Sequence, residues 1–258
     1  MLDLRAALVA VALMAALAVG GWLLSLVRRD VSLVDSVWSL FFLAGAVGYA
    51  CLVGVAADDR RAVVVLVLVS LWAVRLSVYL TWRNWGAPED RRYAAMRAAR
   101  GRAFAWKSLY VVFLLQAALA ALISAPLLVA LGGTRPLGAL DVAGIGLWTV
   151  GFTFEAVGDW QLARFKSDPA NAHQVFDRGL WRYTRHPNYF GEAVLWWGYF
   201  VIAVAAGGWW TVYAPLLMTL LLLKVSGVSL LEKDIHERRP AYRDYRARTN
   251  AFIPWVPR

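Results

Sequence analysis

Residues 7–27 read ALVAVALMAALAVGGWLLSLV, a block of 21 residues without a charged side chain. A helix of ~20 apolar residues, rising ~1.5 Å per residue, crosses the hydrocarbon core of a bilayer. The block is longer than the apolar part of a signal peptide, and it ends at Arg28 and Arg29 instead of at a small-residue cleavage site. These residues therefore predict a transmembrane helix.

Similar apolar blocks recur along the rest of the chain. Of its 258 residues 60% are hydrophobic and 17% charged, which lies outside the range of soluble domains. The lone cysteine, Cys51, cannot form an internal disulfide. We predict an all-α polytopic membrane protein, with one domain over 1–258 and seven transmembrane helices at about 7–27, 31–55, 62–82, 109–131, 139–160, 190–206 and 209–231.

The distribution of basic residues predicts the orientation of these spans. With the N-terminus outside, the inner stretches carry 21 Lys and Arg and the outer stretches carry four. The positive-inside rule then places the C-terminus in the cytoplasm. We expect an integral protein of the bacterial inner membrane, in contact with membrane lipids and monomeric. The net charge of +10 is explained by this asymmetry, so no nucleic-acid partner is expected.

Ionisable side chains within predicted spans point to function, because charge at membrane depth is costly. Asp35 lies near the start of the second span, and Tyr79 lies in the third. Glu155 and Asp159 are four residues apart in the fifth, which puts both on one helix face. Asp159 could equally mark the cytoplasmic end of its helix.

Arginines are abundant in residues 83–102, where Arg83 and Arg92 follow the third span. The planar guanidinium group suits bidentate contacts with phosphate. The alternative is that these arginines contact lipid headgroups, and we prefer that alternative for Arg97, Arg100 and Arg102.

Residues 178–192, RGLWRYTRHPNYFGE, hold the densest polar cluster. Pro187 favours the beginning of a helix, so the neighbouring polar side chains gather at the N-terminal end of the sixth span. Free backbone N–H groups at such an end can bind a phosphate or a carboxamide oxygen. Plain helix capping by Asn188 and Glu192 would not require the arginine, histidine and tyrosines found there, so we favour a ligand site.

Taken together, RHPNYFGE, EAVGDWQLARFK (155–166), LVDSVWS (33–39), RNWGAPEDRRYAAMR (83–97) and AFIPW (251–255) resemble the bacterial branch of the steroid 5-alpha-reductase family. The resemblance implies seven transmembrane helices, NADPH bound from the cytoplasmic side, and reduction of the C4–C5 double bond of a 3-oxo-Δ4-steroid or a related enone lipid. We expect no metal ion. No G-x-G-x-x-G motif lies between a strand and a helix, so loop arginines and helix ends would have to hold the dinucleotide.

The resemblance also implies roles for individual residues. Asn188 and Glu192 would lie near the nicotinamide and its ribose, and Glu155 stands where human-type enzymes have Asn. The cofactor-binding residues are then Arg83, Arg92, Glu155, Asp159, Lys166, Tyr183, Arg185, His186, Asn188 and Glu192, with Glu232, Arg238 and Tyr242 as weaker candidates from a tail segment that matches the family poorly. Those implied for the substrate are Asp35, Trp38 and Tyr79, and we expect Asp35, Tyr79 and Glu192 to be catalytic.

Reduction of an enone needs hydride delivery to the β-carbon and hydrogen-bond donors for the negative charge that develops on the carbonyl oxygen. We expect Tyr79 and Asp35 to be these donors, and Asp35 would have to be protonated to donate. Two alternatives stay open. An S-adenosylmethionine-dependent methyltransferase of the isoprenylcysteine type carries a similar RHPNY box, and a lipid-binding or transport protein could line a passage with the same polar groups.

Overall fold

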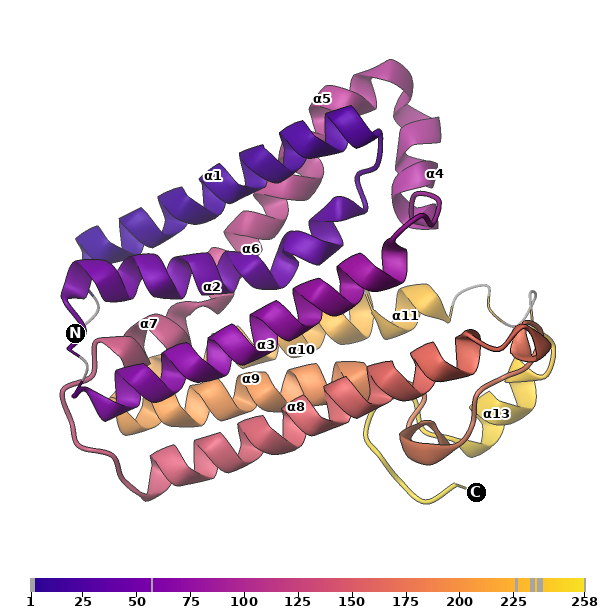
Figure 1. Ribbon diagram of the computed structural model, residues 1–258. Helices are drawn as coiled ribbons and strands as arrows, with labels where there is room; N and C mark the ends of the chain where they lie inside the picture. The colour runs from indigo at the N-terminus through magenta and orange to yellow at the C-terminus, as the bar shows by residue number, and fades with distance from the viewer. Residues whose placement is uncertain (1–2, 57, 226, 233–234, 236–238, 258) are drawn as a thin grey trace. The chain divides into compact units, whose positions relative to one another are not determined.

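The computed structural model describes residues 3–56, 58–225, 227–232, 235 and 239–257. All regular elements of these residues are helical, which confirms the all-α prediction for this part of the chain. The residues fall into two compact units (Figure 1): unit 1 is Met1–Leu137 with Ala205–Gly208, and unit 2 is Gly138–Val204 with Trp209–Arg258. The prediction of one domain stays a prediction, and each unit is described by itself.

Unit 1 is built from long apolar helices with α2 at its centre. Its helices are α1 (Leu4–Arg28), α2 (Leu33–Val53), α3 (Arg60–Asn84), α4 (Arg91–Arg100), α5 (Phe104–Ser108), α6 (Leu115–Ile123) and α7 (Ala125–Leu131). Helix α2 packs against α1, α3, α6 and α7. Phe42 of α2 and Trp72 of α3 are both fully buried, with ring centroids 5.5 Å apart. Aspartates begin three of the helices, since Asp3, Asp59 and Asp90 each accept a hydrogen bond from a first-turn backbone N–H.

The predicted fourth span, 109–131, does not form one uninterrupted helix. Residues Leu109–Leu114 are π-helical, and the helix is broken at Ser124, between α6 and α7. Pro126 stands at the beginning of α7, where its missing N–H costs no internal hydrogen bond. The Ser124 hydroxyl donates to the carbonyl of Ala120 at 2.7 Å, which satisfies an acceptor at the end of α6. Proline and serine together thus explain the break.

Unit 2 contains a long helical pair followed by shorter helices. Its helices are α8 (Ala139–Lys166), η3 (Pro169–Asn171), η4 (Gly179–Arg182), α9 (Pro187–Ala205), η5 (Trp209–Val212), α10 (Tyr213–Leu220), the π-helical Leu221–Val225, α11 (Val228–Leu231) and α13 (Tyr242–Arg248). Helices α8 and α9 lie side by side in Figure 1. The backbone contacts between them pair early residues of one helix with late residues of the other, so the two helices are antiparallel.

Glycines spaced seven residues apart let α8 and α9 touch backbone to backbone. On α8 these glycines are Gly144, Gly151 and Gly158, and on α9 they are Gly191 and Gly198. A Cβ atom added at Gly191 would lie 2.4 Å from the backbone nitrogen of Glu155, and one at Gly198 would lie 2.6 Å from that of Trp148. Lipid provides no hydrophobic drive for helix association, so such close packing is a main source of stability within a bilayer.

Among the described residues, six helices or helical runs are long and apolar enough to cross a membrane: Leu4–Arg28, Leu33–Val53, Arg60–Asn84, Arg91–Ile123, Ala139–Lys166 and Trp209–Leu231. They support an integral membrane protein. The remaining predicted span, 190–206, coincides with α9, which is helical over 19 residues but is not among the six. Its tryptophans, tyrosines and Glu192 lower its hydropathy. The number of seven spans and the orientation stay predictions.

Candidate functional site

The first polar cluster of the site lies where α8 meets the beginning of α9. Asn188 Nδ2 donates to Asp159 Oδ1 at 3.1 Å. Glu155, one turn before Asp159, is 2% exposed, and Glu192, one turn after Asn188, is 7% exposed. Gly191 lies in close contact with the Glu155 backbone, so these side chains of α8 and α9 lie at the same height along the paired helices. Three buried acidic side chains and an amide are thus gathered at a single helix contact, so four predicted cofactor residues do come together.

The side-chain amide of Asn188 uses its donor but not its acceptor in this cluster. Asn188 Oδ1 is buried and accepts no hydrogen bond within the described part of the chain. A buried carbonyl oxygen without a donor costs about 1–3 kcal/mol, so such atoms call for an explanation. An amide N–H donor supplied by a ligand would satisfy it.

The residues just before α9 are fixed by hydrogen bonds to α8 and to α13. Trp181 Nε1 donates to the carbonyl oxygen of Gly158 at 3.0 Å, and the Tyr245 hydroxyl of α13 donates to the carbonyl oxygen of Trp181. The last residues of the chain also contact this segment. The Arg185 backbone N–H donates to the backbone carbonyl oxygen of Asn250 at 2.9 Å. The Trp255 backbone N–H donates to the carbonyl oxygen of Tyr183, also at 2.9 Å. The tail thus holds the beginning of α9 in place.

Glu232 is the centre of a second, charged cluster in unit 2. Its carboxylate accepts from Arg185 Nε at 2.7 Å and from Arg185 Nη2 at 2.8 Å, which is a bidentate ion pair. His186 Nε2 lies 3.0 Å from Glu232 Oε1, and the Tyr242 hydroxyl donates to the same oxygen at 3.0 Å. Burial alone would raise the pKa of Glu232, but the hydrogen bonds of His186 and Arg185 and the charge of Arg185 lower it to about 2. Burial and the charge of Glu232 raise the pKa of the Tyr242 phenol, which therefore stays a donor.

We expect Glu232→Gln to lower the free energy of unfolding by roughly 3 kcal/mol at pH 7, because it leaves Arg185 buried without its counter-charge. A carboxylate with a lowered folded-state pKa stabilises above its ordinary pKa of 4.5, and the contribution disappears as the pH falls toward about 2. Denaturant unfolding of the purified protein from pH 7 to pH 2 measures this difference. The difference in unfolding free energy between the wild type and Glu232→Gln should shrink steadily below pH ~4.5.

The exposed carboxylate Asp244 on α13 provides the matched control. Asp244→Asn should leave the unfolding curve unchanged at every pH. A Glu232→Gln protein as stable as the wild type at pH 7 would contradict the central role of Glu232.

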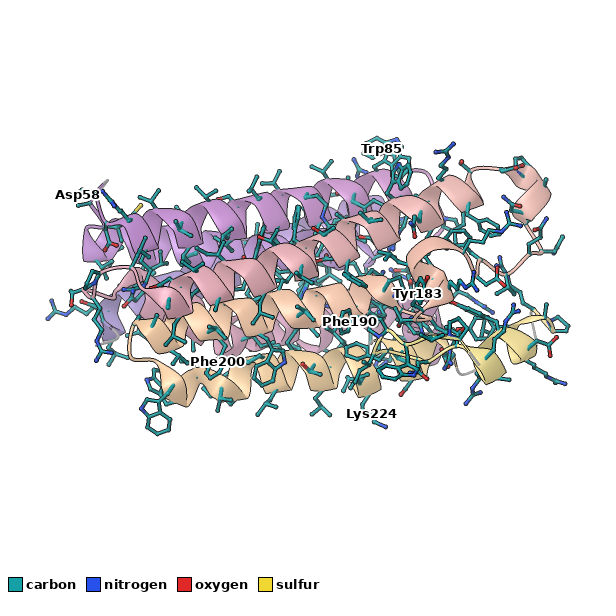
Figure 2. All side chains as sticks on the ribbon, turned by 90° about the horizontal axis from the view of Figure 1, so that it is seen from below. Asp58, Trp85, Tyr183, Phe190, Phe200 and Lys224 are labelled. Carbon is teal, nitrogen blue, oxygen red and sulfur yellow. The ribbon has the colours of Figure 1, made fainter. Side chains whose placement is uncertain are left out.

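The structure changes the expected role of Arg185. Its Nε and Nη2 atoms bind Glu232, and Nη1 donates to the carbonyl oxygens of Arg246 and Thr249. All three nitrogens are thus bound within the chain, so Arg185 positions the cluster and is not available for a phosphate group. Lys166, in the last turn of α8, and Tyr183, just before α9, are both exposed, and Tyr183 is labelled in Figure 2. Arg238 lies outside the described residues.

Unit 1 contains a separate polar cluster around Asp35. Asp35 Oδ2 accepts from Arg92 Nη2 at 2.7 Å, and Oδ1 accepts from the Tyr93 hydroxyl at 2.7 Å. Gln116 Nε2 donates to the Tyr93 oxygen at 3.3 Å, and Arg92 Nε also binds Asp90 at 2.8 Å. A carboxylate held by an arginine accepts hydrogen bonds. The expected role of Asp35 as a donor to a ketone therefore does not match this geometry, and Arg92 binds carboxylates where a phosphate contact was expected.

The other predicted residues of unit 1 lie on α2 and α3. The Trp38 ring packs edge-on against Phe42, with centroids 5.1 Å apart. Tyr79 is half-buried, and the guanidinium carbon of Arg83 lies 5.8 Å from the centroid of its ring. Arg83 itself is exposed at the end of α3. Tyr79 therefore combines a phenol with a neighbouring positive charge.

Gln116 is a site residue that the sequence analysis did not identify, and Tyr93 was not expected to contact Asp35. Gln116 could have been found, because it is the only amide in the predicted span 109–131. Tyr93 gives no such signal, since it lies in a polar stretch and approaches Asp35 from 58 residues away. Within the residues that the structure describes, no group of His, Cys, Asp and Glu could hold a metal ion.

The fold and these clusters define a helical membrane protein with buried polar groups in both of its units. The chain belongs to the DUF1295 family, described as a protein of unknown function, which matches residues 21–249. It is also similar to the uncharacterized protein C594.04c of Schizosaccharomyces pombe, with 26% identity over 90% of this chain and 75% of that protein. The comparison with solved structures gave no significant match.

Proposed function

We propose that the chain is an NADPH-dependent reductase of enone lipids that acts as steroid 5-alpha-reductases do, on a 3-oxo-Δ4-steroid or a related membrane lipid. The observation that carries the proposal is the buried cluster of Glu155, Asp159, Asn188 and Glu192 at the α8–α9 contact, with an unsatisfied acceptor on Asn188. The DUF1295 family includes steroid 5-alpha-reductase-like membrane proteins, which supports the same proposal.

The chemistry of this cluster suits the nicotinamide half of a dinucleotide. A carboxamide NH₂ and ribose hydroxyls are hydrogen-bond donors, and the cluster offers carboxylate oxygens and the free Asn188 Oδ1 as acceptors. Lys166 lies in the last turn of α8, exposed, where it would bind a phosphate group. Bound to these residues, NADPH would supply a hydride for the β-carbon of the enone.

The residues of the chain would orient the substrate and stabilise charge on its carbonyl oxygen. We assign the donor role to Tyr79, whose phenol needs no prior protonation and has the positive charge of Arg83 beside its ring. Tyr93 is a second phenol, oriented by Asp35 and Gln116. In a site closed to water, one such donor contributes ~3 kcal/mol to transition-state stabilisation. Asp35 is then a positioning residue that acts through Tyr93 and Arg92.

We expect NADPH to raise the melting temperature of the purified protein in detergent, whereas S-adenosylmethionine should leave it unchanged. A ligand that binds only the folded state stabilises it by ~2.7 kcal/mol when present at 100 times its dissociation constant. Differential scanning fluorimetry with NADPH, NADH and S-adenosylmethionine measures the effect. Protection by S-adenosylmethionine alone would indicate a methyltransferase, and protection by none of the three would indicate a lipid-binding or transport protein.

A further inference from the structure

Unit 1 contains a cavity that the proposed reaction does not use. Its volume is about 290 Å³, and its walls come from the end of α1, the beginning of α2, the end of α3 and the following loop. The polar residues that line it include Arg28, Arg29, Asp30, Ser32, Ser36 and Asn84. Tyr79, the proposed donor, and Asp35, the positioning residue, are not among its lining residues.

The cavity lies at one end of two candidate transmembrane helices, where such helices would meet lipid headgroups. Helices α1 and α3 are both candidate membrane spans, and they end here at Arg28 and Asn84. Large apolar side chains surround this end, with Val27 82%, Trp82 63% and Trp85 70% exposed. Figure 2 shows Trp85 projecting away from the helices, and exposed tryptophan is typical of the membrane interface. The cavity therefore lies at a helix end with exposed apolar side chains, and its lining is about equally polar and apolar.

The charged groups of the lining, counted together with Arg97, which pairs with Glu89 from outside it, sum to one positive unit. Glu89 is already bound, because its carboxylate accepts from Arg97 Nε and Nη2 at 2.8 Å each and from the Val31 N–H at 2.9 Å. The hydrogen bonds of Arg97 lower the pKa of Glu89, which keeps it paired and charged. Arg28, Arg29 and Asp30 remain, with a net charge of one positive unit.

The Arg28 side chain has an aromatic partner, and Arg29 has an unusual backbone conformation. The Arg28 guanidinium carbon lies 5.2 Å from the centroid of the Trp85 ring, a cation–π contact. Arg29 has a φ of 55°, and it is the only non-glycine residue with positive φ among those described. That conformation costs roughly 1–2 kcal/mol for an L-residue with a Cβ atom. A glycine would be the usual residue at this helix end, so the arginine is kept at a cost in stability.

We propose that this cavity binds the phosphodiester headgroup of a membrane phospholipid. Two guanidinium groups offer bidentate hydrogen bonds to phosphate oxygens, and the Ser32 and Ser36 side chains provide further polar partners. The Asp30 carboxylate suits the hydroxyl or ammonium donors that headgroups carry. Free phosphate has the same chemistry as the headgroup, but only a lipid has acyl chains to cover Val27 and Trp82. At the lower end of the ~300–1,000 Å³ of small-molecule sites, the cavity is too small for a whole dinucleotide.

The test uses the full chain purified in detergent and incubated with phosphatidylglycerol. After repurification, mass spectrometry measures the phosphatidylglycerol retained per chain. We expect Arg28→Ala with Arg29→Ala to reduce retention at least tenfold. The matched control, Arg5→Ala with Arg60→Ala, removes two exposed arginines outside the cavity and should retain lipid as the wild type does.

A second variant keeps the test independent of misfolding. Ser36→Leu fills the cavity from α2 and leaves both arginines in place, so it should lose the lipid as well. Equal retention by the wild type and both cavity variants would overturn the proposal. Complete displacement of the lipid by millimolar glycerol phosphate would identify a soluble phosphate as the ligand, and displacement by NADPH would assign the cavity to the cofactor. Either of these results would also overturn it.

Discussion

Asn188→Ala is expected to lower kcat/KM for NADPH-dependent enone reduction by about 100-fold while the protein stays folded. Asn188 has a buried acceptor without a hydrogen-bond partner among the described residues, at the contact of α8 and α9, so its main role would be to bind the ligand. Misplacement of a reacting group by ~1 Å is enough to cost ~10²-fold in rate. The measurement is the steady-state oxidation of NADPH with a 3-oxo-Δ4-steroid in detergent.

The control for this variant is Gln174→Ala, which removes an exposed amide in the loop between η3 and η4. It should have wild-type kcat/KM. Melting temperatures of both variants should stay within a few degrees of the wild type. An Asn188→Ala protein with unchanged kinetics would remove the α8–α9 cluster from the reaction.

Gly191→Leu is expected to have the largest effect on stability. Even a single Cβ atom at this position would lie 2.4 Å from the backbone nitrogen of Glu155 and 2.5 Å from the carbonyl oxygen of Gly151. Backbone atoms cannot rotate away, so α8 and α9 would have to separate along their length. Overpacking costs ~1–3 kcal/mol even where side chains can adjust. We expect a fall in melting temperature of about 10 °C or more, or no recoverable folded protein.

Gly146→Leu is the matched control, because a Cβ atom at Gly146 would meet nothing within 4 Å. It lies on α8, the helix that packs against α9, and makes the same chemical change. Scanning fluorimetry of both variants compares them directly. If Gly146→Leu were as destabilising as Gly191→Leu, helix propensity and not the glycine contact would explain the loss.

The sequence predicts the helices of this protein better than their contacts. Long uncharged blocks place most spans within a few residues, since bilayer thickness sets their length. The limits of this rule are visible at α9, where tyrosines, tryptophans and Glu192 reduce the hydropathy of a helix that still forms. They are also visible at Ser124, where a proline divides a block that looks continuous.

The site was predictable where local sequence brings its residues together. Glu155 and Asp159 share a helix face, and Asn188 and Glu192 share another, so each pair could be inferred from spacing. The pairing of the two helices depends on glycine contacts and could not be inferred in the same way. Long-range partners were also missed: Arg185 binds Glu232, 47 residues away, and Asp35 binds Arg92, 57 residues away. In both cases an ion pair forms where a ligand contact was expected.

The origin of the hydrogen in the product tests the proposed function most directly. The purified protein would be incubated with NADPH carrying deuterium at both C4 positions and with a 3-oxo-Δ4-steroid, and the product would be analysed by mass spectrometry. We predict a reduced steroid that has gained one deuterium, located at C5. Two results would contradict hydride transfer from the nicotinamide and with it the proposed reductase. In the first, every substrate of a panel of enone lipids, the steroid included, is recovered unchanged. In the second, the reduced product contains no deuterium.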